Sequence, residues 1–181
     1  MRKLIMWNLM TLDGYFEGPN RDIDWHEDVW GDELERFSIE QCHAAGALLF
    51  GRVTYELMAN YWPQAKGEIA DFMNGLPKIV ASRTMETADW HNTRLVRENV
   101  PEEIARLKAE SGKDIFIFGS AELSASLIPQ GLIDEFRLCV VPMVLGGGNS
   151  LFKASPERLK LRLLDSRPLK TGAVILRYQP A

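Results

Sequence analysis

Hydrophobic residues follow two patterns along this chain. Over the first two thirds, short and nearly continuous apolar runs, such as residues 47–50, 78–82 and 114–118, alternate with segments in which apolar residues recur at helical intervals. A short continuous run is typical of a parallel strand that is buried on both faces. This part of the chain therefore predicts a mostly parallel sheet with helices on both of its faces.

The expected helices have recognisable ends. Asp32 is placed to cap a helix that stops before Gly46. Apolar residues at helical spacing predict further helices over residues 53–61, 101–112 and 121–129. Each of these helices lies between two predicted strands, as a parallel sheet requires.

The N-terminal segment predicts a strand followed by a long loop. Residues 3–9 are mostly apolar and lead into an Asp-Gly turn at Asp13 and Gly14. Residues 15–28 are rich in Gly, Pro, Asn and Asp and contain embedded aromatic residues. This composition is typical of an ordered loop of the kind that covers a site.

The last third of the chain predicts longer strands. These cover residues 135–144, 159–166 and 173–178, and a turn at residues 170–172 joins the last two. We therefore expect an α/β fold in which a central, mostly parallel, twisted sheet is flanked by helices and ends in an antiparallel C-terminal hairpin.

The composition excludes several kinds of partner. The chain has 181 residues, of which 46% are hydrophobic and 25% are charged, so we expect one globular domain over residues 1–181. The 21 basic and 25 acidic residues give a net charge of -4, which disfavours nucleic acid. The apolar runs are shorter than the roughly 20 residues that cross a bilayer, and the N-terminal run is too short for a signal peptide. We expect a cytoplasmic protein that binds no membrane.

Cysteine and histidine are too dispersed for a metal site. Cys42 and Cys139 form no CxxC pair, and His26, His43 and His91 have no metal-ligand spacing. We expect two buried thiols and no bound metal.

The residues best suited to ligand binding follow three predicted strands. Residues 51–56 combine a glycine and an arginine with a helix start, residues 82–84 place Arg83 between two hydroxyl groups, and residues 119–123 form a glycine turn into a helix. Ligands of open α/β sheets bind beyond the carboxyl ends of strands, where N–H groups and arginines suit phosphates. Each segment alone is more often an ordinary turn. Together, without a GxGxxG motif, they predict a dinucleotide bound outside a Rossmann fold, with Arg83 at the 2′-phosphate of NADPH.

Several segments, in this order, resemble one known family. They are Thr11-Leu12-Asp13-Gly14, Gly51-Arg52-Val53-Thr54-Tyr55-Glu56, Phe118-Gly119-Ser120-Ala121-Glu122-Leu123, and Leu132-Ile133-Asp134-Glu135 leading to residues 142–148. Over essentially its whole length the chain resembles the riboflavin-biosynthesis reductase domain family. This domain is the C-terminal part of the bifunctional deaminase-reductase and belongs to the dihydrofolate reductase superfamily. The resemblance implies a dihydrofolate reductase-like fold, hydride transfer from NADPH and a homodimer.

The resemblance also implies roles for matching residues. The residues implied to bind NADPH are Asn8, Leu12, Gly14, Gly51, Arg52, Thr54, Ser82, Arg83, Thr84, Gly119, Ser120, Ala121, Glu122 and Leu123. Among them, residues 82–84 look like the adenosine-phosphate loop and residues 119–123 like the pyrophosphate turn, while Asn8 and residues 12–14 would border the nicotinamide. The segment of residues 142–148 stays unassigned, because a strand end or a dimer contact explains it equally well.

Asp13 and Glu35 are the candidate catalytic residues, as proton donors. Asp13 belongs to the matching turn, and Glu35 lies near the start of the helix on which dihydrofolate reductase carries its acidic residue. Both have a structural alternative. Asp-Gly sequences form turns for local reasons, and acidic residues in a first helical turn complement the helix dipole. Water is a further possible proton source.

The departures from the family bear on the substrate. Trp7 stands where the riboflavin-pathway reductases carry a lysine, and a helix with Asp32, Glu33 and Glu35 replaces an arginine-rich one. Carboxylates repel a phosphate group. We therefore expect an NADPH-dependent reductase of a small heterocyclic or carbonyl substrate. The alternatives are the 5-amino-6-(5-phosphoribosylamino)uracil reductase of riboflavin biosynthesis and a non-catalytic nucleotide- or pterin-binding protein.

Overall fold

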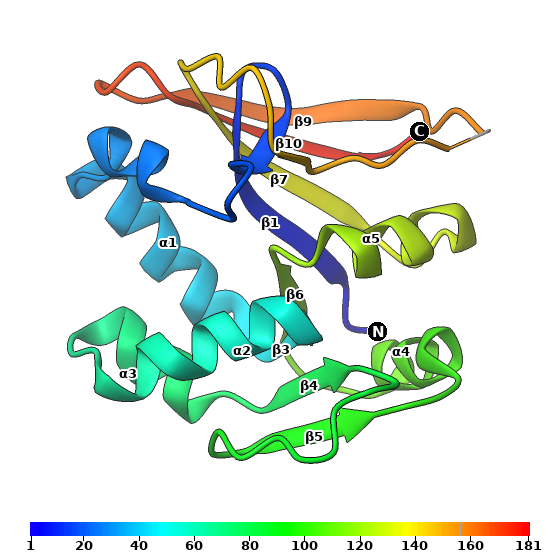
Figure 1. Ribbon diagram of the computed structural model, residues 1–181. Coiled ribbons are helices and arrows are strands. Elements are labelled where there is room, and N and C mark those ends of the chain that lie inside the picture. Colours follow the sequence, from blue (N-terminus) through cyan, green and yellow to red (C-terminus); the bar gives the residue numbers. More distant parts are fainter. Residues whose placement is uncertain (156) are drawn as a thin grey trace.

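A computed structural model describes residues 1–155 and 157–181, and its centre is a twisted sheet (Figure 1). In the order in which they pair, its eight strands are β5 (Thr93–Val96), β4 (Lys78–Ala81), β3 (Ala45–Gly51), β6 (Asp114–Phe118), β1 (Leu4–Thr11), β7 (Glu135–Val141), β10 (Val174–Pro180) and β9 (Leu161–Pro168). Every neighbouring pair from β5 to β7 is parallel, whereas β10 is antiparallel to both β7 and β9. The expected α/β architecture is confirmed.

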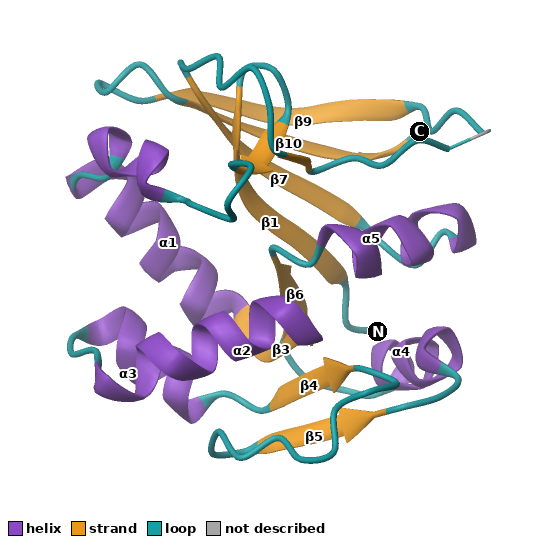
Figure 2. Ribbon diagram, viewed as in Figure 1, coloured by secondary structure: helices purple, strands orange, loops and turns teal. Residues whose placement is uncertain are grey.

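Helices cover both faces of this sheet (Figure 2). On one face lie α1 (Asp32–Ala44), α2 (Arg52–Tyr61) and α3 (Glu68–Gly75), and on the other lie α4 (Val100–Ala109) and α5 (Ala121–Leu127). Short 3-10 helices are η1 (Asp24–Val29), η2 (Trp62–Gln64) and η3 (Ile128–Gln130). Among the described residues, no helix is long and apolar enough to cross a membrane.

The sheet separates two hydrophobic clusters, and strand β1 contributes side chains to both. Ile5 and Trp7 point into the cluster beneath α1, and Leu4 and Met6 point into the one beneath α4 and α5. Successive side chains of a strand alternate between its faces, so a central strand must be apolar on both. This explains the continuous apolar run near the N-terminus.

The boundaries of several elements differ from the predictions. Asp32 does not cap α1: Gly31 occupies that position, and Asp32 lies in the first turn. Gly46 does not end the helix but lies within β3, where an added Cβ would come within 2.8 Å of the Lys113 carbonyl oxygen. Strand β7 ends at Val141 rather than at residue 144, because Pro142 has no N–H to continue the ladder.

Some elements were not predicted at all. The segment expected to be a loop, residues 15–28, contains η1 and a short strand, β2 (Tyr15–Glu17), which pairs with β8 (Asn149–Ser150). Helix α3 was also missed. These elements are too short for an apolar period to distinguish them from loop.

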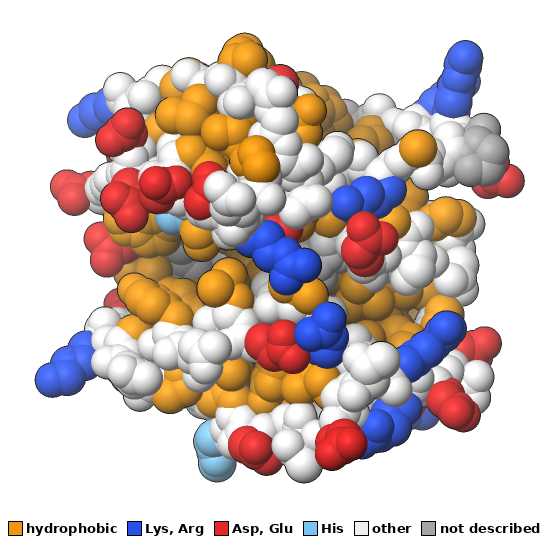
Figure 3. Space-filling model, in the orientation of Figure 1, with side chains coloured by type: hydrophobic (Ala, Val, Ile, Leu, Met, Phe, Trp, Pro, Cys, Tyr) orange, Lys and Arg blue, Asp and Glu red, His pale blue; other side chains and the backbone are white. Residues whose placement is uncertain are grey.

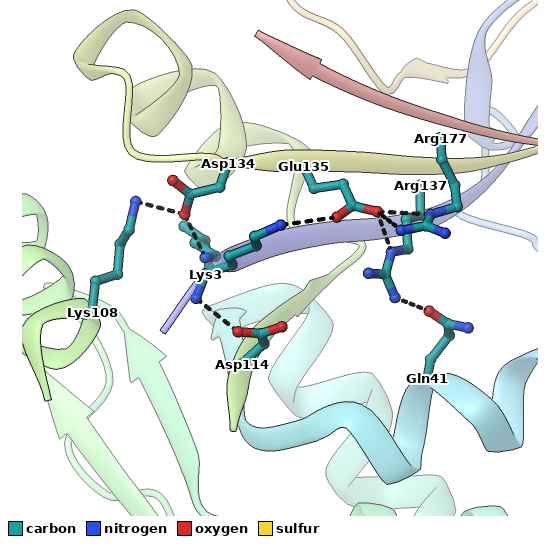
Figure 4. A network of polar contacts seen from close by, with 9 residues as sticks. Lys3, Gln41, Lys108, Asp114, Asp134, Glu135, Arg137 and Arg177 are labelled. Atoms are coloured by element: carbon teal, nitrogen blue, oxygen red, sulfur yellow. Dashed lines mark hydrogen bonds and ion pairs between the residues drawn. The ribbon is translucent and has the colours of Figure 1, made fainter. Parts of the chain in front are cut away.

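The amino ends of β1 and β7 are joined by a polar network (Figure 4). The Glu135 carboxylate, 2% exposed, accepts hydrogen bonds of 2.8 Å from Arg137 Nε and Arg177 Nε, and Lys3 Nζ lies 3.9 Å from it. Arg137 also donates to the side-chain oxygen of Gln41 on α1. Burial alone would raise the pKa of Glu135, but the neighbouring arginines outweigh burial and the pKa is lowered. The carboxylate is therefore ionised and balances the arginines.

Candidate functional site

A cavity of about 900 Å³ opens beyond the carboxyl ends of the parallel strands. Its walls are formed where four strands end: residues 51–54 at the end of β3, residues 81–83 at the end of β4, residues 97–102 after β5 and residues 120–123 after β6. The remaining lining residues are Phe16, Glu17, Arg21, Ser126, Gln130, Asn149 and Lys153. Lys and Arg side chains gather around this part of the surface (Figure 3). The position agrees with the general rule that open α/β sheets bind ligands beyond strand carboxyl ends.

Hydrogen bonds fix the ends of β3 and β6 against each other. The Gly51 N–H donates to Ser120 Oγ at 2.9 Å, and the Ser120 N–H donates to Thr54 Oγ1 at 3.0 Å. Gly119 has a φ of 53°, and an added Cβ would lie 3.0 Å from Thr54 Oγ1, so this turn favours glycine. The two predicted motifs therefore form a single rigid wall.

Asn8 on β1 reaches the same turn. Its Oδ1 accepts a hydrogen bond of 2.5 Å from the Gly119 N–H, which directs Nδ2 away from that amide. Asn8 is buried, and Nδ2 has no hydrogen-bond partner among the described residues. A buried amide group without a partner costs stability. The free donor suits an acceptor oxygen of a ligand.

The far end of the cavity is built by β4 and β5. The Ser82 N–H donates to the Val96 carbonyl at 3.0 Å, and Ser82 Oγ accepts the N–H groups of Thr84 and Met85. Arg83 lies beside this turn, and no carboxylate among the described residues pairs with it. Arg97 lines the same end and donates to the Glu86 carbonyl at 2.7 Å.

The other cations of the cavity differ in their pairing. Arg52 pairs with Glu56 one helical turn later at 3.0 Å, and Lys153 pairs with Glu122 at 3.0 Å. Exposed pairs of this kind are weak and exchange readily with a bound anion. Arg21, in the loop after β2, has no side-chain partner among the described residues.

Most of the predicted cofactor residues come together in this cavity. Those that line it are Gly51, Arg52, Thr54, Ser82, Arg83, Ser120, Ala121, Glu122 and Leu123. Asn8, Gly119 and Thr84 do not line the cavity. Asn8 and Gly119 are hydrogen-bonded to each other behind its wall, and the Thr84 N–H donates to the Ser82 hydroxyl. Leu12 and Gly14 lie in the turn after β1 and do not line the cavity.

Arg21, Arg97 and Asn99 also line the cavity and were not predicted. Arg97 and Asn99 come directly after β5, so the rule that selected the other strand ends could have found them. Arg21 lies in the loop of residues 15–28 that was expected to cover a site, but no motif singles out this residue within the loop.

The candidate proton donors lie outside the cavity lining. The Asp13 carboxylate accepts hydrogen bonds from the Thr11 hydroxyl and from the N–H groups of Leu145 and Gly146, at 2.6 to 3.1 Å. The bonds from Thr11 and Gly146 lower the pKa of Asp13. Glu35 is exposed on α1. This geometry favours a tethering role for Asp13 between two turns, and its role as a proton donor stays a prediction.

The side of α1 that faces the sheet is aromatic. Trp7, 5% exposed, packs on Phe37 with ring centroids 5.1 Å apart. Trp25 in η1 is also buried, and its Nε1 has no partner among the described residues. Asp24, Glu27 and Asp28 surround it on the outside of η1. The region beside α1 is therefore apolar within and acidic at its rim.

Neither cysteine nor histidine builds a metal centre in the part of the chain that the structure describes. Cys42 and Cys139 are both buried, as expected, and burial raises the pKa of their thiols to about 11 and about 12.

Comparison with known proteins agrees with this geometry. Residues 2–175 match the family model of the RibD C-terminal domain. The protein YyaP of Bacillus subtilis (strain 168) is 32% identical to this chain over 182 residues, covering 98% of this chain and 94% of YyaP.

Solved structures show the same fold. A putative riboflavin biosynthesis protein from Shewanella sp. PV-4 superposes with a TM-score of 0.81 at 22% identity, covering 99% of both chains. The dihydrofolate reductase of Enterococcus faecalis, in a complex with NADP(H), superposes with a TM-score of 0.67 at 14% identity, covering 98% of this chain and 96% of that one. The fold is thus dihydrofolate reductase-like.

Proposed function

Since this chain belongs to the RibD C-terminal domain family, we propose that it is an NADPH-dependent reductase of a small heterocyclic or carbonyl substrate. One observation carries the proposal: backbone donors, hydroxyl groups and arginines from several strand ends line one cavity, and Arg83 in that cavity has no carboxylate partner among the described residues. An arginine without a carboxylate partner, beside hydroxyl groups and backbone donors, is suited to a phosphate group.

The residues present fit NADPH. We assign Ser82 and Arg83 to the 2′-phosphate and residues 119–123 with Arg52 to the pyrophosphate side. Asn8 does not line the cavity, but its Nδ2, unpartnered among the described residues, lies directly behind the Gly119 turn, and we assign Asn8 to the nicotinamide side of the site. When bound, the cofactor supplies a hydride to the substrate. The chain contributes orientation and the exclusion of water.

The substrate is proposed to be uncharged or cationic. Trp7 is packed into the core and offers no charge, and the rim beside α1 carries Asp24, Glu27 and Asp28. A ribose phosphate would lose its hydration beside these carboxylates, and Arg167, which lies over the Phe37 ring, already pairs with Glu40. Both features disfavour a phosphate group here. We therefore expect the aminopyrimidine ribosyl phosphate of riboflavin biosynthesis to be a poor substrate.

The test is a paired measurement on purified protein. NADPH binding is titrated by tryptophan fluorescence, and NADPH oxidation is then followed with a panel of pterins, uncharged carbonyl compounds and the riboflavin-pathway intermediate. We expect binding, and turnover with an uncharged member of the panel. Robust turnover of the riboflavin-pathway intermediate, or complementation of a strain that lacks the riboflavin reductase, would restore the pathway assignment.

A second candidate is a nucleotide-binding protein without catalysis. It is favoured by the hydrogen bonds that occupy Asp13 and by the exposed position of Glu35, which leave both candidate donors away from the cavity. NADPH binding without oxidation in any arm of the panel would select this alternative.

We also propose a homodimer that forms at the β9 edge of the sheet and a cytoplasmic location. Strand β9 is the last strand of the sheet, and seven of its eight residues are exposed, including Leu163 and Leu164. A long open edge is a template for pairing with a second chain. Light scattering at micromolar concentration tests it, and a monomer would count against it.

A further inference from the structure

We propose that Arg21 is a phosphate-binding residue of this cavity, placed over the pyrophosphate of a bound dinucleotide by a loop that Gly148 supports. This inference rests on the proposed function and adds to it a residue from outside the predicted motifs. It also gives a role to Gly148, which belongs to the segment of residues 142–148 that the family resemblance leaves unassigned.

Arg21 has a charge that the chain does not neutralise. Its side chain lines the cavity, yet no hydrogen bond or ion pair holds its guanidinium within the described part of the chain. The other cavity cation without such a contact is Arg83, whereas Arg52, Arg97 and Lys153 all have protein partners. A cation beside a cavity that lacks its own counter-ion is suited to an anionic ligand.

The loop of residues 18–22 is built to hold Arg21 in one place. Its ends are closed by hydrogen bonds from the Gly18 N–H to the Asp22 carbonyl at 2.9 Å and from the Arg21 N–H to the Gly18 carbonyl at 3.0 Å. An added Cβ on Gly18 would lie 2.2 Å from the Asp22 carboxylate. Arg21 has a φ of 63°, which is uncommon for a residue with a side chain and persists only where the surroundings enforce it.

Gly148 provides the surface on which this loop rests. It has a φ of 135°, and an added Cβ would lie 2.3 Å from the Glu17 carbonyl oxygen and 3.0 Å from the Gly18 Cα. The next residue, Asn149, donates from Nδ2 to Glu17 Oε1 at 2.6 Å. Only a residue without a side chain allows the two backbones to approach so closely. The position of Arg21 therefore depends on a glycine far along the sequence.

The sheet order decides which phosphate Arg21 meets. Arg83 follows β4, and the loop with Arg21 follows β2, which continues from β1. Two strands, β3 and β6, lie between β4 and β1. The two free arginines therefore come from opposite ends of the cavity. With Arg83 at the 2′-phosphate, Arg21 belongs to the half nearer Asn8, where the pyrophosphate is the anionic group.

The experiment uses the whole protein and measures binding rather than activity. The Arg21→Ala variant is expected to weaken NADPH and NADH by the same factor, about tenfold at low ionic strength, because both carry the pyrophosphate. Binding of 2′-AMP should not change. Arg83→Ala should show the opposite pattern, with NADPH and 2′-AMP weakened and NADH unaffected. Arg36→Ala, which removes an exposed arginine of α1 outside the cavity, is the matched control.

Every outcome decides between the assignments. Wild-type affinity of Arg21→Ala for both dinucleotides overturns the inference and leaves the proposed function standing. A loss restricted to NADPH moves Arg21 to the 2′-phosphate and also overturns it. Wild-type protein that binds neither dinucleotide overturns the proposed function, and this inference with it.

The supporting role of Gly148 has its own control in the neighbouring residue. An added Cβ on Gly147 meets no atom within 4 Å, whereas one on Gly148 collides with the Arg21 loop. Gly148→Ala should therefore weaken both dinucleotides by a similar factor, while Gly147→Ala should not. In the double variant with Arg21→Ala, the two losses should not add, since both remove the same contact. Full additivity would show that Gly148 acts independently of Arg21.

Discussion

Two groups of arginines in this protein differ in what neutralises them. Arg137 and Arg177, at the amino end of β7 and on the neighbouring β10, share the buried carboxylate of Glu135. Arg21 and Arg83 line the cavity beyond the carboxyl ends of the parallel strands and pair with no carboxylate among the described residues. The first group holds the fold together, and the second is available to a ligand. Changes to the first group should therefore alter the free energy of unfolding, whereas changes to the second should alter ligand affinity.

The largest expected effect is on stability. Glu135→Gln leaves Arg137 and Arg177 side by side, partly buried and without their counter-ion, and should lower the free energy of unfolding by about 3–5 kcal/mol. Glu56→Gln, which removes the exposed partner of Arg52, should cost less than about 1 kcal/mol. Urea denaturation of both variants measures the difference. Equal small losses would show that the network is not a stabilising unit.

The same carboxylate predicts a pH dependence. Because the folded state lowers the pKa of Glu135 below its ordinary value of 4.5, its contribution is complete above that pH and is lost as the pH falls through the folded pKa. The stability difference between wild type and Glu135→Gln should therefore shrink in acid. A difference that stays constant down to pH 3 would contradict this.

The next effect concerns the ligand. Arg83→Ala should weaken NADPH binding by roughly 1.5–3 kcal/mol, on the scale of a lost hydrogen bond to a charged group, and should leave NADH nearly unchanged. Its free energy of unfolding should stay close to that of wild type, because Arg83 is exposed and makes no ion pair with the described residues. Calorimetric titration measures the first and urea denaturation the second. Equal losses for both cofactors would remove the 2′-phosphate assignment.

These contrasts also show what the sequence could predict. The cavity walls were predictable because parallel strands bring their carboxyl ends to one edge, so residues 51–54, 82–83 and 120–123 had to meet. The Glu135 network and the Arg21 loop were not, because each depends on partners distant in sequence, such as Arg177 and Gly148. Local patterns cannot specify such packing. Helix α3 was missed for the separate reason that its apolar period is too short.

Lys78 is a buried cation that is held by backbone carbonyl groups instead of a carboxylate. Lys78 is 1% exposed and donates to the carbonyl groups of Met73, Asn74 and Leu76 at 2.8 to 3.0 Å, with the Trp90 ring 4.5 Å away. Burial lowers the pKa of Lys78 to about 8. Between that pH and 10.5 the unfolded chain binds more protons at this residue than the folded one, so stability should rise with pH.

The comparison is with Lys78→Met, which lacks the titrating group. From pH 8 to pH 10 the free energy of unfolding of wild type should increase by about 1–2 kcal/mol relative to this variant. Urea denaturation of both proteins at each pH gives the difference. Parallel curves would mean that the three carbonyl groups keep the ammonium charged and that burial does not dominate.

The smallest effect is a salt dependence that separates the two groups of arginines without mutation. Ions screen charges that face solvent, over a Debye length of about 10 Å at 0.1 M, but screen buried pairs much less. Dinucleotide binding at Arg21 and Arg83 should therefore weaken several-fold between about 0.05 and 0.5 M salt. Over the same range, the difference in unfolding free energy between wild type and Glu135→Gln should change by less than about 0.5 kcal/mol. NADPH should lose more affinity than NADH, because it carries the additional phosphate that Arg83 is proposed to bind. If NADPH and NADH instead lose affinity in parallel, no unpaired cation holds the 2′-phosphate. Arg83 would then not belong with the arginines that bind the cofactor.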